Sequence, residues 1–285
     1  MVQDPRIRIL HPMPLRQPVL IAAWPGMGLV GFNAVEFLRA ALGAEQVAEI
    51  EPADFFAVAG VQVKDGLTVP LKVPHNTFHG WRNPASGKDV LLFLGSAQPV
   101  SGREMTLSML VLEVARTFGA TQIFTAAAMA AQIDHLTPSR VFGVSSSAVE
   151  IGRLERLGVT MLPEGEIGGL NGLLIGVAQQ QGMLGSCLMG EMPHYTTHIE
   201  NPKASKAVLE VLSQLLSIPL DLSPLEERAR YIETQIQGFL AAARTASESA
   251  SASGETEESS ASEDDEGQEP GSGGGKSGTG GVSVN

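Results

Sequence analysis

Two glycine-rich segments and one pair of titratable residues are the parts of this sequence that could do chemistry. The first segment, residues 24–31, follows an apolar run and satisfies the dinucleotide-binding pattern G-x-G-x-x-G. Glu49 and Glu51 lie about where a ribose-binding carboxylate falls in such folds. Pro25, however, removes a backbone N–H from the surface that would face phosphate. We therefore favour close packing of a strand against a helix, with a nucleotide-binding turn as the alternative. The candidate ligand-binding residues here are Gly26, Met27, Gly28 and Gly31.

The second glycine-rich segment, residues 163–172, opens a helix that the sequence predicts over 170–181. The amino end of a helix carries free N–H groups and can hold an anion. Alternatively, the glycines let this helix press close to a sheet. The candidate ligand-binding residues are Glu166, Gly168, Gly169 and Asn171.

Two further groups follow predicted buried strands. Gly95, Ser96 and Gln98 come directly after the strand 89–94, where α/β folds often bind ligands, although a tight turn explains them equally well. Glu191 and His194 come after the strand 185–189 and, by their placement in a predicted loop, are the best general acid and base pair of the chain. Their spacing alone does not show that they meet.

A metal site is not favoured by the sequence. His75 and His79 are four residues apart, but Pro74, Gly80 and Pro84 make a helix there improbable, and a metal site with this spacing requires both histidines on one helix face. We interpret this segment as a surface or oligomer-contact loop. We expect no metal and no cofactor, and we assign no catalytic residue.

The elements that position these residues alternate between strand and helix. Buried strands are predicted over 19–23, 46–50, 89–94, 122–126, 141–145 and 185–189, and helices over 33–42, 102–118, 148–157 and 170–181. This alternation predicts an α/β fold with a mainly parallel central sheet and helices on both faces. The section 55–73 interrupts it with an antiparallel hairpin around Lys64-Asp65-Gly66.

Two helices and a polar tail complete the chain. The first helix begins after Asn201, and the second begins at Ser223. The second carries an apolar stripe that would pack against this domain or against another copy of the chain. We expect the face around Ile232 and Ile236 to meet a neighbouring subunit. The stripe consists of Leu225, Ala229, Ile232, Ile236 and Phe239 or Leu240. Residues 1–243 then form one domain, and residues 244–285 a disordered, acidic tail rich in Ser, Glu and Gly.

Composition limits the classes of partner. The net charge of −12 is concentrated after residue 244, where nine acids and one base contribute −8 and leave −4 for the body. No basic patch with interleaved aromatics suggests nucleic-acid binding, and no apolar run is long enough to suggest a membrane span. The single cysteine, Cys187, excludes an internal disulfide and favours a cytoplasmic location.

Four segments in the same order resemble the proteasome assembly chaperone 2 family, in its prokaryotic branch. They are residues 24–31, residues 165–172, Leu-Met-Gly-Glu at 188–191 and Asp-Leu-Ser-Pro-Leu at 221–225. The resemblance covers residues 6–243. It implies a three-layer α/β/α sandwich similar to nucleoside phosphorylases, C-terminal helices and homo-oligomers, and it implies no established catalytic residues.

The family resemblance has one departure. Members that dock on the proteasome end in a hydrophobic residue, a tyrosine and any residue, whereas this sequence ends Ser283-Val284-Asn285, which makes docking through the tail doubtful. We expect a non-catalytic interaction protein or assembly-chaperone-like protein whose partner is unknown. The alternative is a small-molecule or nucleotide-binding enzyme. Convergence of the glycine-rich loops on a polar cleft would favour ligand binding, and a closed apolar junction would favour the interaction protein.

Overall fold

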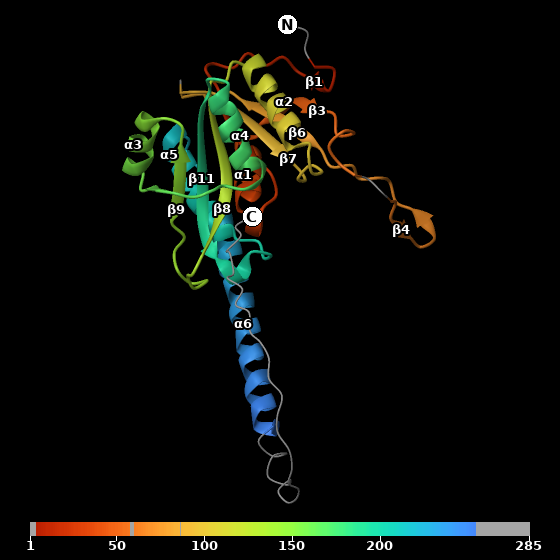
Figure 1. Cartoon of the computed structure of the whole chain (residues 1–285), viewed down its shortest axis with the longest axis vertical. Helices are drawn as coiled ribbons and strands as arrows, with labels where there is room; N and C mark the ends of the chain where they lie inside the picture. The colour runs from red at the N-terminus through yellow and green to blue at the C-terminus, as the bar shows by residue number, and fades with distance from the viewer. Residues whose placement is uncertain (1–3, 58–59, 86, 255–285) are drawn as a thin grey trace, which may run out of the picture.

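The fold is built around one large sheet between two layers of helices (Figure 1). The computed structural model describes residues 4–57, 60–85 and 87–254, with side chains to residue 246. In the sheet the strands follow the order β1-β3-β6-β7-β2-β8-β11-β9-β10. They are β1 (Ile7–Ile9), β2 (Val19–Ala23), β3 (Glu45–Ile50), β6 (Asn76–Trp81), β7 (Val90–Gly95), β8 (Gln122–Ala131), β9 (Val141–Ser145), β10 (Thr160–Met161) and β11 (Leu184–Pro193).

The centre of the sheet is parallel. The adjacent strands β7, β2, β8 and β11 all run in the same direction. The flanking strands β1, β3 and β6 pair antiparallel, as does β9 with β11. The parallel strands have near-continuous apolar sequences because both of their faces are covered. The α/β class with a mainly parallel central sheet is therefore confirmed.

Helices cover both faces of this sheet, as predicted. They are α1 (Val30–Leu42), α2 (Glu104–Thr117), α3 (Ala148–Arg156), α4 (Gly169–Gln180), α5 (Pro202–Leu216) and α6 (Ser223–Gly254). Alternate side chains of β2 point to opposite faces. Leu20 and Ala22 belong to the core beneath α2 and α4, and Ile21 and Ala23 to the core beneath α1 and α5. Both faces are closed by apolar contacts, which gives the three-layer architecture.

Three strands correct the sequence-based prediction. The segment around His75 and His79 is not a loop, because Asn76–Trp81 forms β6 and pairs with both β3 and β7. The prolines at 74 and 84 flank this strand without interrupting its hydrogen bonds. Strands β8 and β11 are also longer than predicted and pair with each other along their whole length. Glu191 therefore lies inside a strand and not in a loop.

A small hairpin projects from the body between β3 and β6 (Figure 1). Its strands are β4 (Val63–Lys64) and β5 (Leu67–Thr68), and they pair antiparallel. Asp65 and Gly66 form the turn with φ of 51° and 77°, as a two-residue hairpin turn with two positive φ values requires. The predicted hairpin is confirmed. We call residues 60–73 the β4–β5 arm.

Helix α6 extends well beyond the sheet (Figure 1). Its first turns pack on α5, and the helix then continues past the expected boundary at Arg244 to Gly254. Residues 245–254 are therefore helical and not irregular. The rest of the expected acidic tail, including Ser283-Val284-Asn285, lies outside the described residues. Within the described part of the chain, no helix has the length and apolar character needed to cross a membrane.

Candidate functional site

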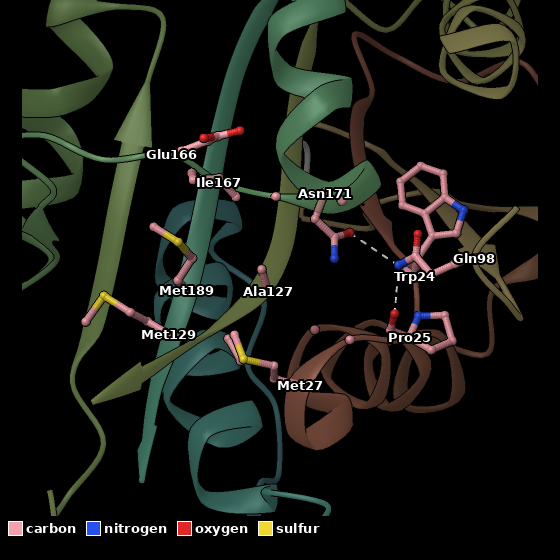
Figure 2. Close-up of a pocket in the computed structure, with 15 residues that line it drawn as sticks. Trp24, Pro25, Met27, Gln98, Ala127, Met129, Glu166, Ile167, Asn171 and Met189 are labelled. Carbon is pink, nitrogen blue, oxygen red and sulfur yellow. Dashed lines mark hydrogen bonds between the residues drawn. The ribbon is translucent and has the colours of Figure 1, made fainter. Parts of the chain in front are cut away.

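A cavity of about 360 Å³ opens at the carboxyl ends of the central parallel strands β2, β8 and β11 (Figure 2). Loops and strand ends from five parts of the chain line it. The lining consists of Trp24, Pro25, Gly26, Met27, Gly31, Gln98, Ala127, Ala128, Met129, Glu166, Ile167, Gly168, Gly169, Asn171 and Met189. The carboxyl edge of parallel strands is where open α/β sheets form ligand crevices.

The structure brings together most of the residues that the sequence singled out. The lining includes Gly26, Met27, Gly31, Gln98, Glu166, Gly168, Gly169 and Asn171. The other candidates, Gly28, Gly95, Ser96, Glu191 and His194, do not line this cavity. The two glycine-rich segments thus meet at one place, although well over a hundred residues separate them in the sequence.

Asn171 joins these two segments. Its Oδ1 accepts a hydrogen bond from the backbone N–H of Trp24 at 3.3 Å, and its backbone carbonyl accepts one from Thr125 Oγ1 at 2.7 Å. The residue is only 7% exposed. Its Nδ2 points toward the cavity in Figure 2 and has no hydrogen-bond partner among the described residues. One unpaired donor that faces the cavity is therefore left for whatever occupies it.

The glycines of the first segment have different roles. A Cβ at Gly31 would lie 1.9 Å from the carbonyl oxygen of Ala126, so α1 rests directly on the backbone of β8. Gly28 has a φ of 56°, a backbone conformation that favours glycine. A Cβ at Gly26 would meet nothing within 4 Å. Close helix packing therefore explains Gly31, whereas Gly26 borders open space.

Gly95 and Ser96 serve packing and loop structure. A Cβ at Gly95 would lie 2.3 Å from the indole of Trp24, so the absence of a side chain makes room for that ring. Ser96 Oγ accepts a hydrogen bond from the backbone N–H of His75 at 2.8 Å, and the backbone N–H of Ser96 bonds to the His75 carbonyl. These contacts hold the loop that follows β7 against the residue that precedes β6.

The cavity wall is mostly apolar. Met27, Met129 and Met189 lie along one side of it in Figure 2. Polar groups are few: Gln98 Nε2 donates to the Pro25 carbonyl at 2.8 Å, and Glu166 is exposed at the rim. Among the described lining residues, Glu166 alone has a titratable side chain. The lining therefore offers a binding surface and no pair of groups for general acid–base catalysis.

Glu191 and His194 do not form the predicted acid–base pair. Both carboxylate oxygens of Glu191 accept hydrogen bonds from the guanidinium of Arg140, at 2.8 and 2.7 Å, and the side chain is 1% exposed. The hydrogen bonds from Arg140 lower the pKa of Glu191. His194 is exposed and lies edge-on to Tyr195. A buried carboxylate held in its charged form by an arginine is a structural ion pair, not a proton donor.

The histidines of β6 are also separated by their surroundings. His79 is buried, and its Nδ1 has no hydrogen-bond partner among the described residues. Burial, with a smaller effect of the Arg39 charge, lowers the pKa of His79 from 6.5 to about 4. His75, just before the strand, is exposed. The imidazole rings of His75 and His79 therefore do not point to one shared metal position.

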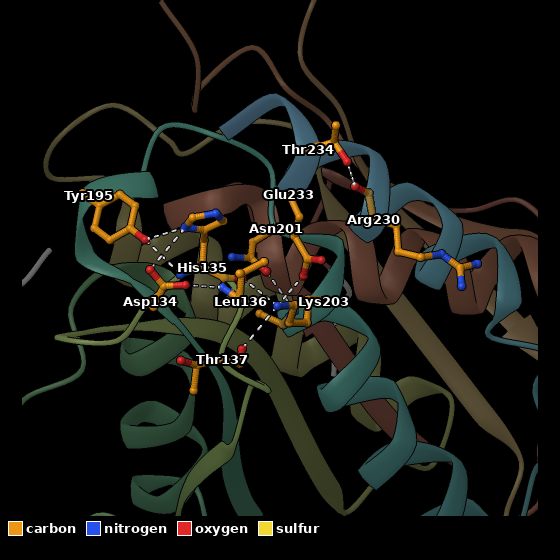
Figure 3. Close-up of polar contacts among 11 residues, drawn as sticks. Asp134, His135, Leu136, Thr137, Tyr195, Asn201, Lys203, Arg230, Glu233 and Thr234 are labelled. Carbon is orange, nitrogen blue, oxygen red and sulfur yellow. Dashed lines mark hydrogen bonds and ion pairs between the residues drawn. The ribbon is translucent and has the colours of Figure 1, made fainter. Parts of the chain in front are cut away.

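Polar contacts that the sequence did not predict hold the base of α6 (Figure 3). Lys203 Nζ donates to the carbonyl of His135 at 2.6 Å and pairs with Glu233 of α6. One turn further along α5, Lys206 pairs with Glu226 at 3.1 Å. The lysines on α5 and the acids on α6 were visible in the sequence, but only the helix crossing shows which of them meet.

The apolar stripe of α6 divides into a packed part and an exposed part. Leu225 and Ala229 are buried against the body, and Ile232 and Ile236 border a small cavity beside Asn201 and Pro202. Phe239 is 75% exposed. Ile232 and Ile236 are half-buried against their own domain, and the expectation that they also meet a neighbouring subunit stays a prediction. The unpartnered part of the stripe begins after them.

The β4–β5 arm is another place where several large apolar side chains meet solvent. Its exposed residues are Val61, Val63, Leu67, Leu71 and Val73, with exposed fractions from 38% to 74%. Contiguous exposed apolar side chains on a soluble protein often mark an interaction site. The molecule thus presents apolar surface on both of its projecting segments.

Comparisons with known proteins agree with this architecture. A family model described as the PAC2 family matches residues 20–240. The chain is 30% identical over 227 residues to the uncharacterized protein MJ1210 of Methanocaldococcus jannaschii, an alignment that covers 79% of this chain and 83% of that protein.

Two solved structures share the fold at 25% identity. One is PbaB of Pyrococcus furiosus, an archaeal proteasome activator, with a TM-score of 0.71 over 82% of this chain and 97% of PbaB. The other is Rv2125 of Mycobacterium tuberculosis, a proteasome-assembly chaperone homologue, with a TM-score of 0.66 over 77% of this chain and 94% of Rv2125.

Proposed function

Because this chain belongs to the PAC2 family, we propose that it is a non-catalytic protein-binding protein that acts as an assembly chaperone and forms homo-oligomers. The description of Rv2125 as a proteasome-assembly chaperone homologue supports this class, and PbaB, a proteasome activator, supports the proteasome as the partner. The proposed partners are proteasome subunits that have not yet assembled.

The observation that carries the proposal is the projection of α6. Helix Ser223–Gly254 leaves the body with the exposed Phe239 on the same stripe as the buried Leu225 and Ala229. The stripe follows a spacing of four and three residues, which is typical of helices that pack along their length against another helix. A second copy of the chain would cover the part that its own domain leaves exposed.

The base of α6 is fixed well enough to present this surface. Glu233 and Glu226 pair with Lys203 and Lys206 of α5, and Arg228 pairs with Glu200. Exposed ion pairs contribute little individually, about 0–1 kcal/mol each. Together with the buried Leu225, however, they define the direction in which the helix leaves the body.

The β4–β5 arm is the proposed contact for the partner protein. It exposes Val63 and Leu67 next to Lys64, and the arm is remote from the central sheet (Figure 1). A hairpin with exposed apolar side chains and unpaired outer edges can pair with a strand of another protein. The arm and α6 thus supply two separate surfaces, one for a client and one for a second copy.

A cytoplasmic location is part of the proposal. Cys187 is completely buried, and burial raises the pKa of its thiol to about 11. A buried thiol of this kind is an inert core residue. The support for the location is that a chain with one cysteine forms no internal disulfide, as is usual for proteins of a reducing compartment.

The test is direct binding to separately purified, unassembled proteasome subunits of the same organism, followed by size-exclusion chromatography with light scattering. The proposal predicts a complex of defined mass for the wild type. It predicts loss of that complex in Val63→Asp/Leu67→Asp. The matched control is Thr68→Asp, which adds charge to the arm and removes no large apolar side chain. If the wild type forms no complex with any subunit, the proposed partner class is wrong.

A further inference from the structure

The cavity at the ends of β2, β8 and β11 has no part in the proposed protein contacts. It is a preformed pocket with one hydrogen-bond donor, Asn171 Nδ2, that has no partner among the described residues. Its volume of about 360 Å³ lies within the usual range of small-molecule sites, roughly 300–1,000 Å³. Lining residues come from the two glycine-rich segments, which Asn171 joins through its bond to the Trp24 backbone. The pocket is therefore fixed by backbone contacts at its rim.

One side of the pocket suits an apolar molecule. Met27, Met129 and Met189 line it together with Ala127 and Ala128. Methionine side chains are flexible and polarisable, and they adapt to apolar groups of different shape. The methionine side of the pocket therefore favours an apolar ligand group without requiring one particular shape.

The other end offers hydrogen-bond donors. Asn171 is 7% exposed, and its Nδ2 faces the pocket without a partner among the described residues (Figure 2). Gly168 and Gly169 begin α4 beside it, and no side chain caps this helix end. The first N–H groups of a helix have no partner within the helix. These groups would all donate to an acceptor such as a carbonyl oxygen.

Charge decides between a neutral and an anionic acceptor. No lysine or arginine is found among the described lining residues, and Glu166 stands at the rim. A carboxylate or phosphate would gain from the amino end of α4 but would have no cationic side chain to pair with. It would also be repelled by Glu166. The balance favours an uncharged head group.

We propose that this pocket binds an uncharged, mainly apolar small molecule whose carbonyl oxygen accepts hydrogen bonds from Asn171 Nδ2 and the amino end of α4. The hydrocarbon part lies against Met27, Met129 and Met189. This ligand-binding function goes beyond the protein-binding role and stands independently of it.

The test uses hexanamide as the probe and the full chain labelled with ¹³C at its methionine methyl groups. Hexanamide carries a carbonyl head on a flexible chain, whereas hexanoate and hexylamine carry the same chain with negative and positive heads. Binding at about millimolar concentration is expected for a molecule of this size. The signals of Met27, Met129 and Met189 should shift with hexanamide. Those of Met105 and Met109, which are exposed on α2, should not.

Two substitutions test the assigned contacts. Asn171→Asp keeps an oxygen to accept from the Trp24 N–H but replaces the Nδ2 donor, so hexanamide affinity should fall about tenfold, as for the loss of one hydrogen bond. Gly26→Leu places a side chain at a lining position with nothing within 4 Å of its Cβ, and it should weaken binding by obstructing the pocket. The matched control is Gly176→Leu on α4, which also borders open space but does not line the pocket.

The head-group preference has its own test. Hexanamide should bind more tightly than hexanoate, and Glu166→Gln should narrow that difference because it removes the negative charge at the rim. Far-ultraviolet circular dichroism confirms that each variant is folded. The proposal is overturned if the three pocket methionines do not shift with hexanamide up to its solubility limit. It is also overturned if folded Asn171→Asp and Gly26→Leu both bind hexanamide as the wild type does.

Discussion

Asn171 Oδ1 accepts a hydrogen bond from the backbone N–H of Trp24 at 3.3 Å, a contact between residues 147 positions apart. It ties the first turn of α4 to the end of the central strand β2. Both glycine-rich segments therefore serve one local structure at the carboxyl edge of the sheet. Gly31 lets α1 lie directly on the backbone of β8, and the cavity lies beside this contact.

The glycines of the first segment should differ sharply in their tolerance of a methyl group. Gly31→Ala places Cβ 1.9 Å from the Ala126 carbonyl oxygen, so α1 must move away from β8. We expect a loss of about 1–3 kcal/mol in the free energy of unfolding, as for other overpacked sites. Gly26→Ala, with nothing within 4 Å of its Cβ, is the control and should change stability by less than about 0.5 kcal/mol. Urea denaturation of both variants checks the difference, and equal losses would contradict the close approach of α1.

The sequence predicted the central architecture because buried parallel strands leave a direct signal. The runs Val19–Ala23 and 90–94 are apolar without interruption, and each is followed by a helical pattern. It also identified most of the cavity lining, since glycine-rich turns after such strands gather at one edge of the sheet. What it lacked was the length of β11, because Glu191 and Pro193 do not resemble a buried strand.

The partner of Glu191 explains that failure. A carboxylate is rarely buried inside a strand unless it is paired. Arg140, which supplies the pair, lies just before β9, and only the antiparallel pairing of β9 with β11 brings it within reach. A similar limit applies to His79, whose burial follows from the pairing of β6 with both neighbours.

Loss of Arg140 should therefore destabilise the fold in a pH-dependent way. Arg140→Met leaves the buried carboxylate of Glu191 without its guanidinium, and we expect a lower Tm than the wild type at pH 7. The folded-state pKa of Glu191 is lowered, so the stabilisation is present above the ordinary carboxyl range and is lost as the pH falls through the folded pKa. The difference in Tm between Arg140→Met and the wild type should therefore become smaller at acidic pH.

Arg8→Met is the matched control for that variant. Arg8 is paired with Glu49 and Glu51 at the exposed edge strand β1, where an ion pair contributes little. Thermal unfolding of both variants at pH 7 and in acid separates the two positions. A Tm for Arg140→Met equal to that of the wild type at pH 7 would show that the pair is not structural.

His79 predicts a second pH dependence, over a higher range. Its pKa is lowered to about 4 in the folded state, whereas an unfolded histidine has a pKa of 6.5. Between these values the unfolded chain binds a proton that the folded chain does not, so stability is complete above pH 6.5 and falls toward pH 4. The loss should be about 2–4 kcal/mol. His79→Leu should remove this part of the slope, which denaturant unfolding across pH 4–7 measures. If the free energy of unfolding of His79→Leu depends on pH as that of the wild type does, another group than His79 takes up the proton.

Self-association is tested by the mass of the full chain, measured by size-exclusion chromatography with multi-angle light scattering at micromolar concentration. Self-association through α6 predicts a mass that is a multiple of 30.0 kDa for the wild type. Phe239→Asp, at an exposed position on the stripe, should return the mass toward that of one chain. Ala241→Asp, exposed on the opposite side of the same helix, should leave it unchanged. A wild-type mass of one chain, or an oligomer that Phe239→Asp does not weaken, would contradict the proposal.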